Sequence, residues 1–204
     1  MTAPLSDQAL LDYSDEHLMH ELSMLFELGD TLPGRKAGME TSALLESFAT
    51  HLRNLIEFFF YPSKGEYVRA QDFFDDPATW SPPLNTDLTK LLERANNQVS
   101  HLTRNRVSGN PPEKVWRTAE MVKQIEIIGK EFAEKASDKK LHAHVRELLT
   151  LPREQILLWI SENVAHANVA AQRVTSASTP LPHYADGTST ATIVTIKRTL
   201  GATD

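Results

Sequence analysis

Apolar residues recur at intervals of three and four along most of the chain, which is the pattern of amphipathic helices. The pattern predicts helices over residues 15–28, 40–61, 88–106, 112–136, 138–149 and 152–164. We expect Ser14 to cap the first helix and Gly29 to end it. No alternation of strands with helices is present, so the predicted fold class is all-α, an up-and-down helical bundle of about five or six helices.

The connection between the second and third predicted helices is unusually long. Residues 62–84 exceed the roughly 15 residues that a structureless loop seldom passes unless it packs or acts. Phe73, Phe74 and Trp80 predict that this segment packs as a strap over the bundle. Pro82 and Pro83 delay the next helix, which Asn85 or Thr86 then caps.

The composition divides the chain into four parts. Residues 1–14 are predicted to be a lead-in, 15–136 the main helical bundle, and 137–174 additional helices packed on it. Ser137 with Asp138, and then Pro152, are the predicted starts of the additional helices. Residues 175–204, rich in threonine, serine, alanine and proline, are predicted to form a mostly irregular tail. Within the tail, residues 190–199 are β-branched and are suited to a strand or strap if they dock.

Composition narrows the classes of function. The 204 residues contain no cysteine, which excludes disulfides, thiolate zinc sites and cysteine nucleophiles and fits a reducing compartment. We find no run of about 18 apolar residues that would suggest a membrane span and no secretory signal, so we expect a cytoplasmic protein without membrane partners. The net charge of −6 argues against nonspecific coating of nucleic acid.

One basic segment stands out from this acidic background. Between Leu88 and Arg117 there are six cations and two anions, a net charge of +4. On the predicted helix in this segment, Arg94, Asn97, His101 and Arg104 are spaced by three and four residues and therefore share one face. A separate apolar stripe faces the core and consists of Leu88, Leu92, Ala95, Val99 and Leu102.

The polar face has the residue types that metal-free cleavage of RNA requires. A base must deprotonate the ribose 2′-hydroxyl, an acid must protonate the leaving oxygen, and cations must stabilise the phosphate charge. Histidine suits the proton transfers because its ordinary pKa is about 6.5. The planar fork of arginine matches phosphate oxygens in pairs. The same spacing also fits a solvated polar face that carries a histidine.

The segment RANNQVSH, residues 94–101, resembles the motif of the HEPN superfamily, an arginine followed by four to six residues and a histidine. The aromatic-rich helix end HLRNLIEFF, residues 51–59, is similar to an earlier helix of that superfamily, and the resemblance covers about residues 15–136. It implies an all-α homodimer that acts as a metal-independent endoribonuclease, in toxin–antitoxin or phage-defence systems. The implied partners are RNA and an antitoxin or other protein.

Carried over onto this chain, the resemblance makes Arg94 and His101 catalytic. Asn96 or Asn97 becomes the polar companion of the arginine, and we add Arg104 as a substrate-binding residue. Ala95 follows the arginine directly, where HEPN proteins often have asparagine, aspartate or histidine. The competing interpretation is a non-catalytic helical interaction or RNA-binding protein with the same bundle.

Other chemistry has weaker support in the sequence. His17 with His20, and His142 with His144, have spacings that can bind a metal, but no Glu-x-x-His pair of a di-metal bundle is present. No Gly-x-Ser-x-Gly nucleophile motif and no glycine-rich phosphate loop is found. The sequence therefore predicts no cofactor and no metal ligands. Arg53 and Asn54 lie among apolar neighbours and either face solvent or need polar partners.

Overall fold

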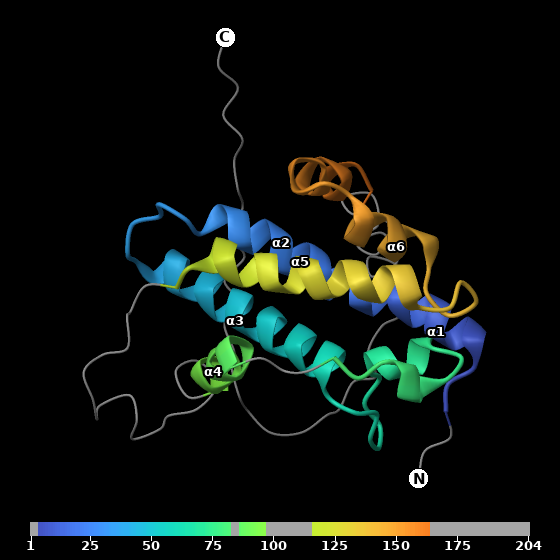
Figure 1. Ribbon diagram of the computed structural model, residues 1–204. Helices are drawn as coiled ribbons and strands as arrows, with labels where there is room; N and C mark the ends of the chain where they lie inside the picture. Colours follow the sequence, from blue (N-terminus) through green and yellow to red (C-terminus); the bar gives the residue numbers. More distant parts are fainter. Residues whose placement is uncertain (1–3, 83–85, 97–115, 164–204) are drawn as a thin grey trace, which may run out of the picture.

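The computed structural model describes residues 4–82, 86–96 and 116–163 (Figure 1). Within these ranges the protein is an all-α helical bundle, which confirms the predicted fold class. The described helices include none that is both long enough and apolar enough to cross a membrane. The predicted tail from residue 175 lies outside the described residues.

The first helix begins earlier than the sequence suggested. α1 (Asp7–Tyr13), a π-helical turn (Ser14–Leu18) and α2 (Met19–Thr31) follow one another without a break. Ser6 is the N-cap, and its Oγ accepts a hydrogen bond from the Ala9 N–H at 3.2 Å. The prediction that Ser14 caps the helix was wrong, because Ser14 is fully buried within it and its hydroxyl donates to the Leu11 carbonyl. Much of the predicted lead-in is therefore helix.

Three long helices form the centre of the bundle. α3 (Met39–Phe60) matches its predicted bounds, and it lies beside α2 and α5 (Thr118–Lys135) (Figure 1). Gly29 does not end α2. It is buried against α5, and a Cβ at this position would lie 2.4 Å from Val122 Cγ2. Gly29 is thus explained by the close approach of two helices rather than by a helix end.

The second half of the bundle begins its helices later than predicted. Trp116 and Arg117 precede α5 in non-helical conformation, and Thr118 Oγ1 donates to the Gly29 carbonyl at 3.1 Å. Ser137 does not cap a helix, because residues 138–140 form a turn; its N–H donates to the Phe73 carbonyl in the strap. α6 (Ala143–Thr150) is capped instead by His142. Residues 153–163 form the helix predicted after Pro152.

Residues 62–82 pack as the predicted strap. They contain two short 3₁₀ helices, Ala70–Phe73 and Pro77–Thr79. Trp80 is buried, and its Nε1 donates to the Phe59 carbonyl at 2.8 Å, near the end of α3. The strap and the long helices together form an aromatic cluster of rings in mutual contact, consisting of Phe58, Phe59, Phe73, Phe74, Trp80 and Phe132.

Candidate functional site

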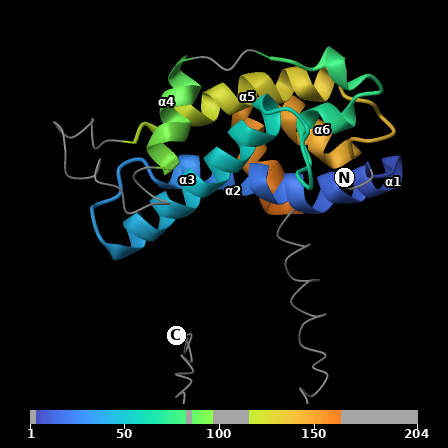
Figure 2. The ribbon, with the colours of Figure 1, turned by 90° about the horizontal axis from the view of Figure 1, so that it is seen from below.

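The predicted basic face begins on α4 (Thr86–Ala95), a helix that packs against α3 (Figure 2). Leu88, Leu92 and Ala95 are buried, which confirms the described part of the predicted apolar stripe. Val99 and Leu102, the other two positions of this stripe, lie outside the described residues.

Arg94 is half-buried near the end of α4. Its guanidinium carbon lies 4.3 Å from the centroid of the Trp116 ring, within the range of a cation–π contact. Because Trp116 lies two residues before the start of α5, this contact joins the end of α4 to the start of α5. Asn96 is also half-buried, whereas Asn97, His101 and Arg104 lie outside the described residues. Of the five predicted site residues, the structure therefore positions Arg94 and Asn96.

The second segment of the HEPN resemblance, residues 51–59, lies on α3 and forms a polar network with α2. His51 Nδ1 lies 2.8 Å from Glu21 Oε2, and Asn54 Nδ2 donates to both Glu21 carboxylate oxygens at 3.2 Å. Arg53 Nε donates to Glu57 at 3.0 Å along the same helix. Asn54 is exposed and Arg53 is half-buried. The sequence left open whether these residues face solvent or have polar partners. Both have a polar partner, and Asn54 also faces solvent.

A cavity of about 330 Å³ opens beside this network, between the π-helical turn, α3 and the strap. Arg69 enters it from the strap and lies 3.6 Å from Glu57, while its own Nε is buried with no hydrogen-bond partner among the described residues. The lining contains both signs of charge and combines polar with apolar groups, namely Tyr13, Leu18, Glu21, Arg53, Asn54, Leu55, Glu57, Phe58, Glu66, Tyr67, Val68 and Arg69. This mixed charge suits a polar ligand of low net charge rather than a strongly anionic one.

Tyr13 is the group in this cavity whose ionisation is perturbed. Burial raises its pKa above the ordinary 10.0, the negative charge of Glu21 raises it further, and the positive charge of Arg69 opposes both. The phenol therefore stays protonated in the folded chain at a pH where it ionises in the unfolded chain.

This shift predicts a loss of stability at alkaline pH that depends on Tyr13. Well below pH 10, Tyr13 is protonated in both the folded and the unfolded state, so it adds no pH dependence to the free energy of unfolding there. As pH rises through the raised pKa, the unfolded state binds fewer protons and the free energy of unfolding falls. Urea denaturation of wild type and Tyr13→Phe from about pH 9 to 11 should show a steeper decline in the wild type. Tyr61→Phe, at an exposed position, is the matched control; equal slopes in all three proteins would contradict the assignment.

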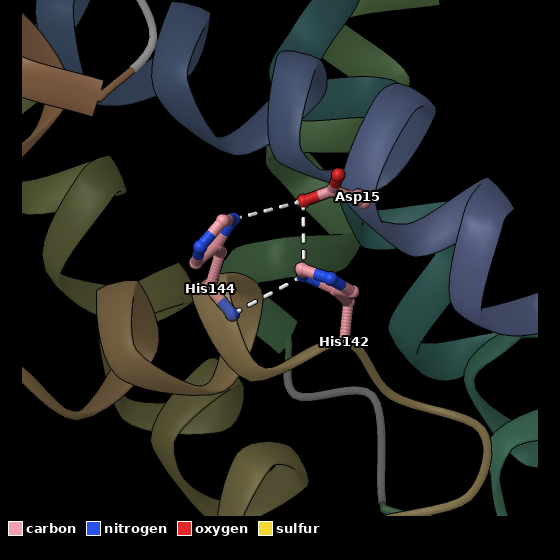
Figure 3. A group of neighbouring side chains, drawn as sticks. All are labelled: Asp15, His142 and His144. Atoms are coloured by element: carbon pink, nitrogen blue, oxygen red, sulfur yellow. Dashed lines mark hydrogen bonds and ion pairs between the residues drawn. The ribbon is translucent and has the colours of Figure 1, made fainter.

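A third polar group, the two-histidine cluster, consists of Asp15, His142 and His144. Asp15 Oδ1 lies 2.9 Å from His142 Nδ1 and 3.2 Å from His144 Nδ1 (Figure 3). Asp15 comes from the π-helical turn, and the two histidines come from the start of α6. α6 and α4 lie toward opposite ends of the bundle, so this cluster is remote from α4 (Figures 1 and 2).

Comparisons with protein-family models, with curated proteins and with solved structures find no match to this chain. The candidate sites therefore rest on the residues and geometry of the chain itself.

Sequence reasoning identified Arg94 and the polar residues of α3. It missed two associations: the contact of Asp15 with the two histidines, and the entry of Arg69 into the cavity. The sequence shows the His142–His144 spacing, but the third member of the cluster, Asp15, precedes His144 by 129 residues. Arg69 was not singled out either, since it lies in the strap rather than on a patterned helix. Neither association has a local signal, because each depends on which distant segments the fold brings together.

Proposed function

We propose that the chain is a metal-independent endoribonuclease of the HEPN type, acting as a homodimer, with Arg94 and His101 as its catalytic pair. His101 serves as the acid–base group that moves protons at the ribose 2′-hydroxyl and the leaving oxygen. Arg94 stabilises charge on the phosphate, and Asn96, Asn97 and Arg104 orient the RNA. Cleavage by this route leaves a 2′,3′-cyclic phosphate.

The observation that carries the proposal is the position of Arg94. Its guanidinium carbon lies 4.3 Å from the centroid of the Trp116 ring, a cation–π contact, and arginine recognises phosphate through its planar fork of N–H groups. The contact with Trp116 also limits the rotamers of a long side chain, which reduces the entropy lost when substrate binds.

The arrangement of the helices gives further support. Residues 51–59 lie on α3 and Arg94 lies on α4, and these two helices pack together. The net charge of +4 between Leu88 and Arg117 provides a local attraction for RNA on an acidic protein.

The test is cleavage of total RNA and tRNA in EDTA by purified full-length protein. Wild type should cut, and His101→Ala should lower the rate by about 10²–10⁴-fold, the usual contribution of a general acid–base group. Arg94→Lys keeps the charge but loses the planar fork, so it should lower the rate by about 10²-fold or more. Arg117→Lys, an exposed arginine next to Trp116, is the matched control and should cut like wild type.

Two outcomes would contradict the proposal. If His101→Ala cuts as fast as wild type, the activity belongs to another site or to a contaminant. If folded wild type binds RNA but does not cut it, the chain is a helical RNA-binding protein, which is the competing interpretation. Size-exclusion chromatography on the same samples tests the expected homodimer.

A further inference from the structure

The two-histidine cluster joins the first helix of the bundle to α6. In Figure 3 the two imidazole rings lie on one side of the Asp15 carboxylate, and one ligand atom from each residue falls within 4.8 Å of the other two. The exposed fractions of the side chains are 45% for Asp15, 32% for His142 and 55% for His144, so the cluster is accessible from solvent.

The backbone around the cluster holds its members in place. The π-helical turn at Ser14–Leu18 carries Asp15, and such turns are frequent at functional sites. The hydroxyl of buried Ser14 accepts the His142 N–H at 3.0 Å and donates to the Leu11 carbonyl at 2.8 Å. The His144 and Trp159 rings are in T-shaped contact, with the ring centroids 6.1 Å apart. The two elements that carry the ligand side chains are thus packed against each other.

The contacts inside the cluster require a hydrogen atom or a cation between a ring nitrogen and Asp15. His142 Nδ1 lies 2.9 Å from Asp15 Oδ1 and also accepts the His144 N–H at 3.3 Å. One ring nitrogen cannot donate to Asp15 and accept from that N–H at the same time. Without a proton on Nδ1, its lone pair faces the carboxylate oxygen and the two repel. Either a proton or a metal ion must therefore lie between the imidazoles and Asp15.

The donor set favours a metal of a particular class. Two imidazole nitrogens and one carboxylate oxygen match the ligands of zinc and related divalent ions, whereas magnesium and calcium prefer oxygen alone. In tetrahedral zinc sites with bonds of about 2.0–2.1 Å, neighbouring ligand atoms are about 3.3–3.4 Å apart. The distances of 2.9 and 3.2 Å from Asp15 Oδ1 to the two nitrogens are slightly shorter than this spacing.

We propose that Asp15, His142 and His144 bind a divalent transition-metal ion, Zn²⁺ in the first place. Three protein ligands leave a fourth tetrahedral position for water or another ligand. Bound there, the ion links the π-helical turn to the start of α6 and stabilises the docking of α6. The site is independent of the proposed ribonuclease function, which needs no metal.

Binding is tested by titrating tag-free, metal-stripped full-length protein with Zn²⁺ in a calorimeter. We expect one equivalent to bind, with Mg²⁺ giving no heat of binding. Asp15→Asn, His142→Gln and His144→Gln should each weaken this binding by at least about tenfold, because each removes one ligand. Glu16→Gln and His17→Gln, exposed neighbours in the same π-helical turn, are matched controls and should bind like wild type.

Thermal unfolding and fluorescence give independent readouts. At about 100 times the dissociation constant, Zn²⁺ should raise the Tm of wild type by roughly 5–10 °C. Co²⁺ at the same site should quench Trp159, and the quenching should disappear in Trp159→Phe. Circular dichroism of each variant without metal shows whether it is folded, so that weakened binding is not mistaken for unfolding.

The proposal is overturned if no Zn²⁺ binds, or if the Asp15 and histidine variants bind as tightly as wild type. Equal weakening by Glu16→Gln would also overturn it, because that result marks nonspecific attraction to surface carboxylates. If the three variants lower the Tm of metal-free protein but Zn²⁺ has no effect, the three side chains stabilise the fold through their direct contacts alone and the metal site is rejected.

Discussion

Replacement of Phe132 by alanine should lower the free energy of unfolding by about 3–5 kcal/mol. Phe132 is fully buried at the centre of the aromatic cluster, and its ring centroid lies within 6.0 Å of five other rings. The rings pack mostly edge to face, an arrangement that adds to the energy of burial alone. Alanine would leave a cavity that three different segments border, namely α3, the strap and α5.

Equilibrium denaturation in urea measures this effect. Ile127→Ala is the matched control, because Ile127 lies on the same helix but is exposed, and its replacement should change stability by no more than about 0.5 kcal/mol. A loss below about 1 kcal/mol for Phe132→Ala would mean that the cluster does not form the centre of the core in solution.

Trp80→Ala should cost a similar amount, about 3–5 kcal/mol, and should also release the strap. Trp80 stacks on Phe74 at a centroid distance of 5.2 Å, and its indole N–H donates to the Phe59 carbonyl. That carbonyl belongs to the last turn of α3, where carbonyls have no partner within the helix. Loss of the indole removes both the ring packing and the partner of the helix end.

Limited proteolysis distinguishes release of the strap from general unfolding. Under conditions in which the variant remains folded, protease should cut within residues 62–82 faster in Trp80→Ala than in wild type. Trp80→Phe keeps most of the packing but loses the hydrogen bond, so it should cost less, about 1–3 kcal/mol. If Trp80→Phe and Trp80→Ala are equally destabilised, the hydrogen bond rather than the packing secures the strap.

Features with strong local signals were predictable from the sequence. The 3.6-residue periodicity over residues 40–61 predicted α3 closely, since its apolar stripe is broad and Pro62 follows it. The burial of Phe73, Phe74 and Trp80 in the strap was also predicted, because large aromatic side chains in a long connection need a surface to cover.

Features that depend on distant contacts were not predictable in the same way. Ser14 has the residue type of a helix cap, but it faces α6, which the local sequence does not reveal. Gly29 has the residue type of a helix end, but Val122 occupies the space a side chain would need. The backbone N–H of Ser137 donates to the carbonyl of Phe73, which lies in the strap. In each case a tertiary contact decides what a locally ambiguous residue does.

The candidate sites follow the same division. Helical spacing on one segment was enough to single out Arg94, and the structure places it against Trp116. The two-histidine cluster combines a turn near the N-terminus with the start of α6, and no helical spacing relates them. Association across so many residues becomes visible only when the helices are packed.

The order of segments in the core also constrains how the chain folds. The Gly29 carbonyl accepts a hydrogen bond from Thr118, which lies 89 residues later in the chain. The Ser14 hydroxyl accepts one from the N–H of His142, which lies 128 residues later. The central ring of the aromatic cluster, Phe132, comes after the other five in the chain. During synthesis, the emerging N-terminal half therefore exposes apolar surface that only later residues cover. Contacts of such long sequence separation slow folding relative to bundles with local contacts, and we expect the described core to form in one late, cooperative step.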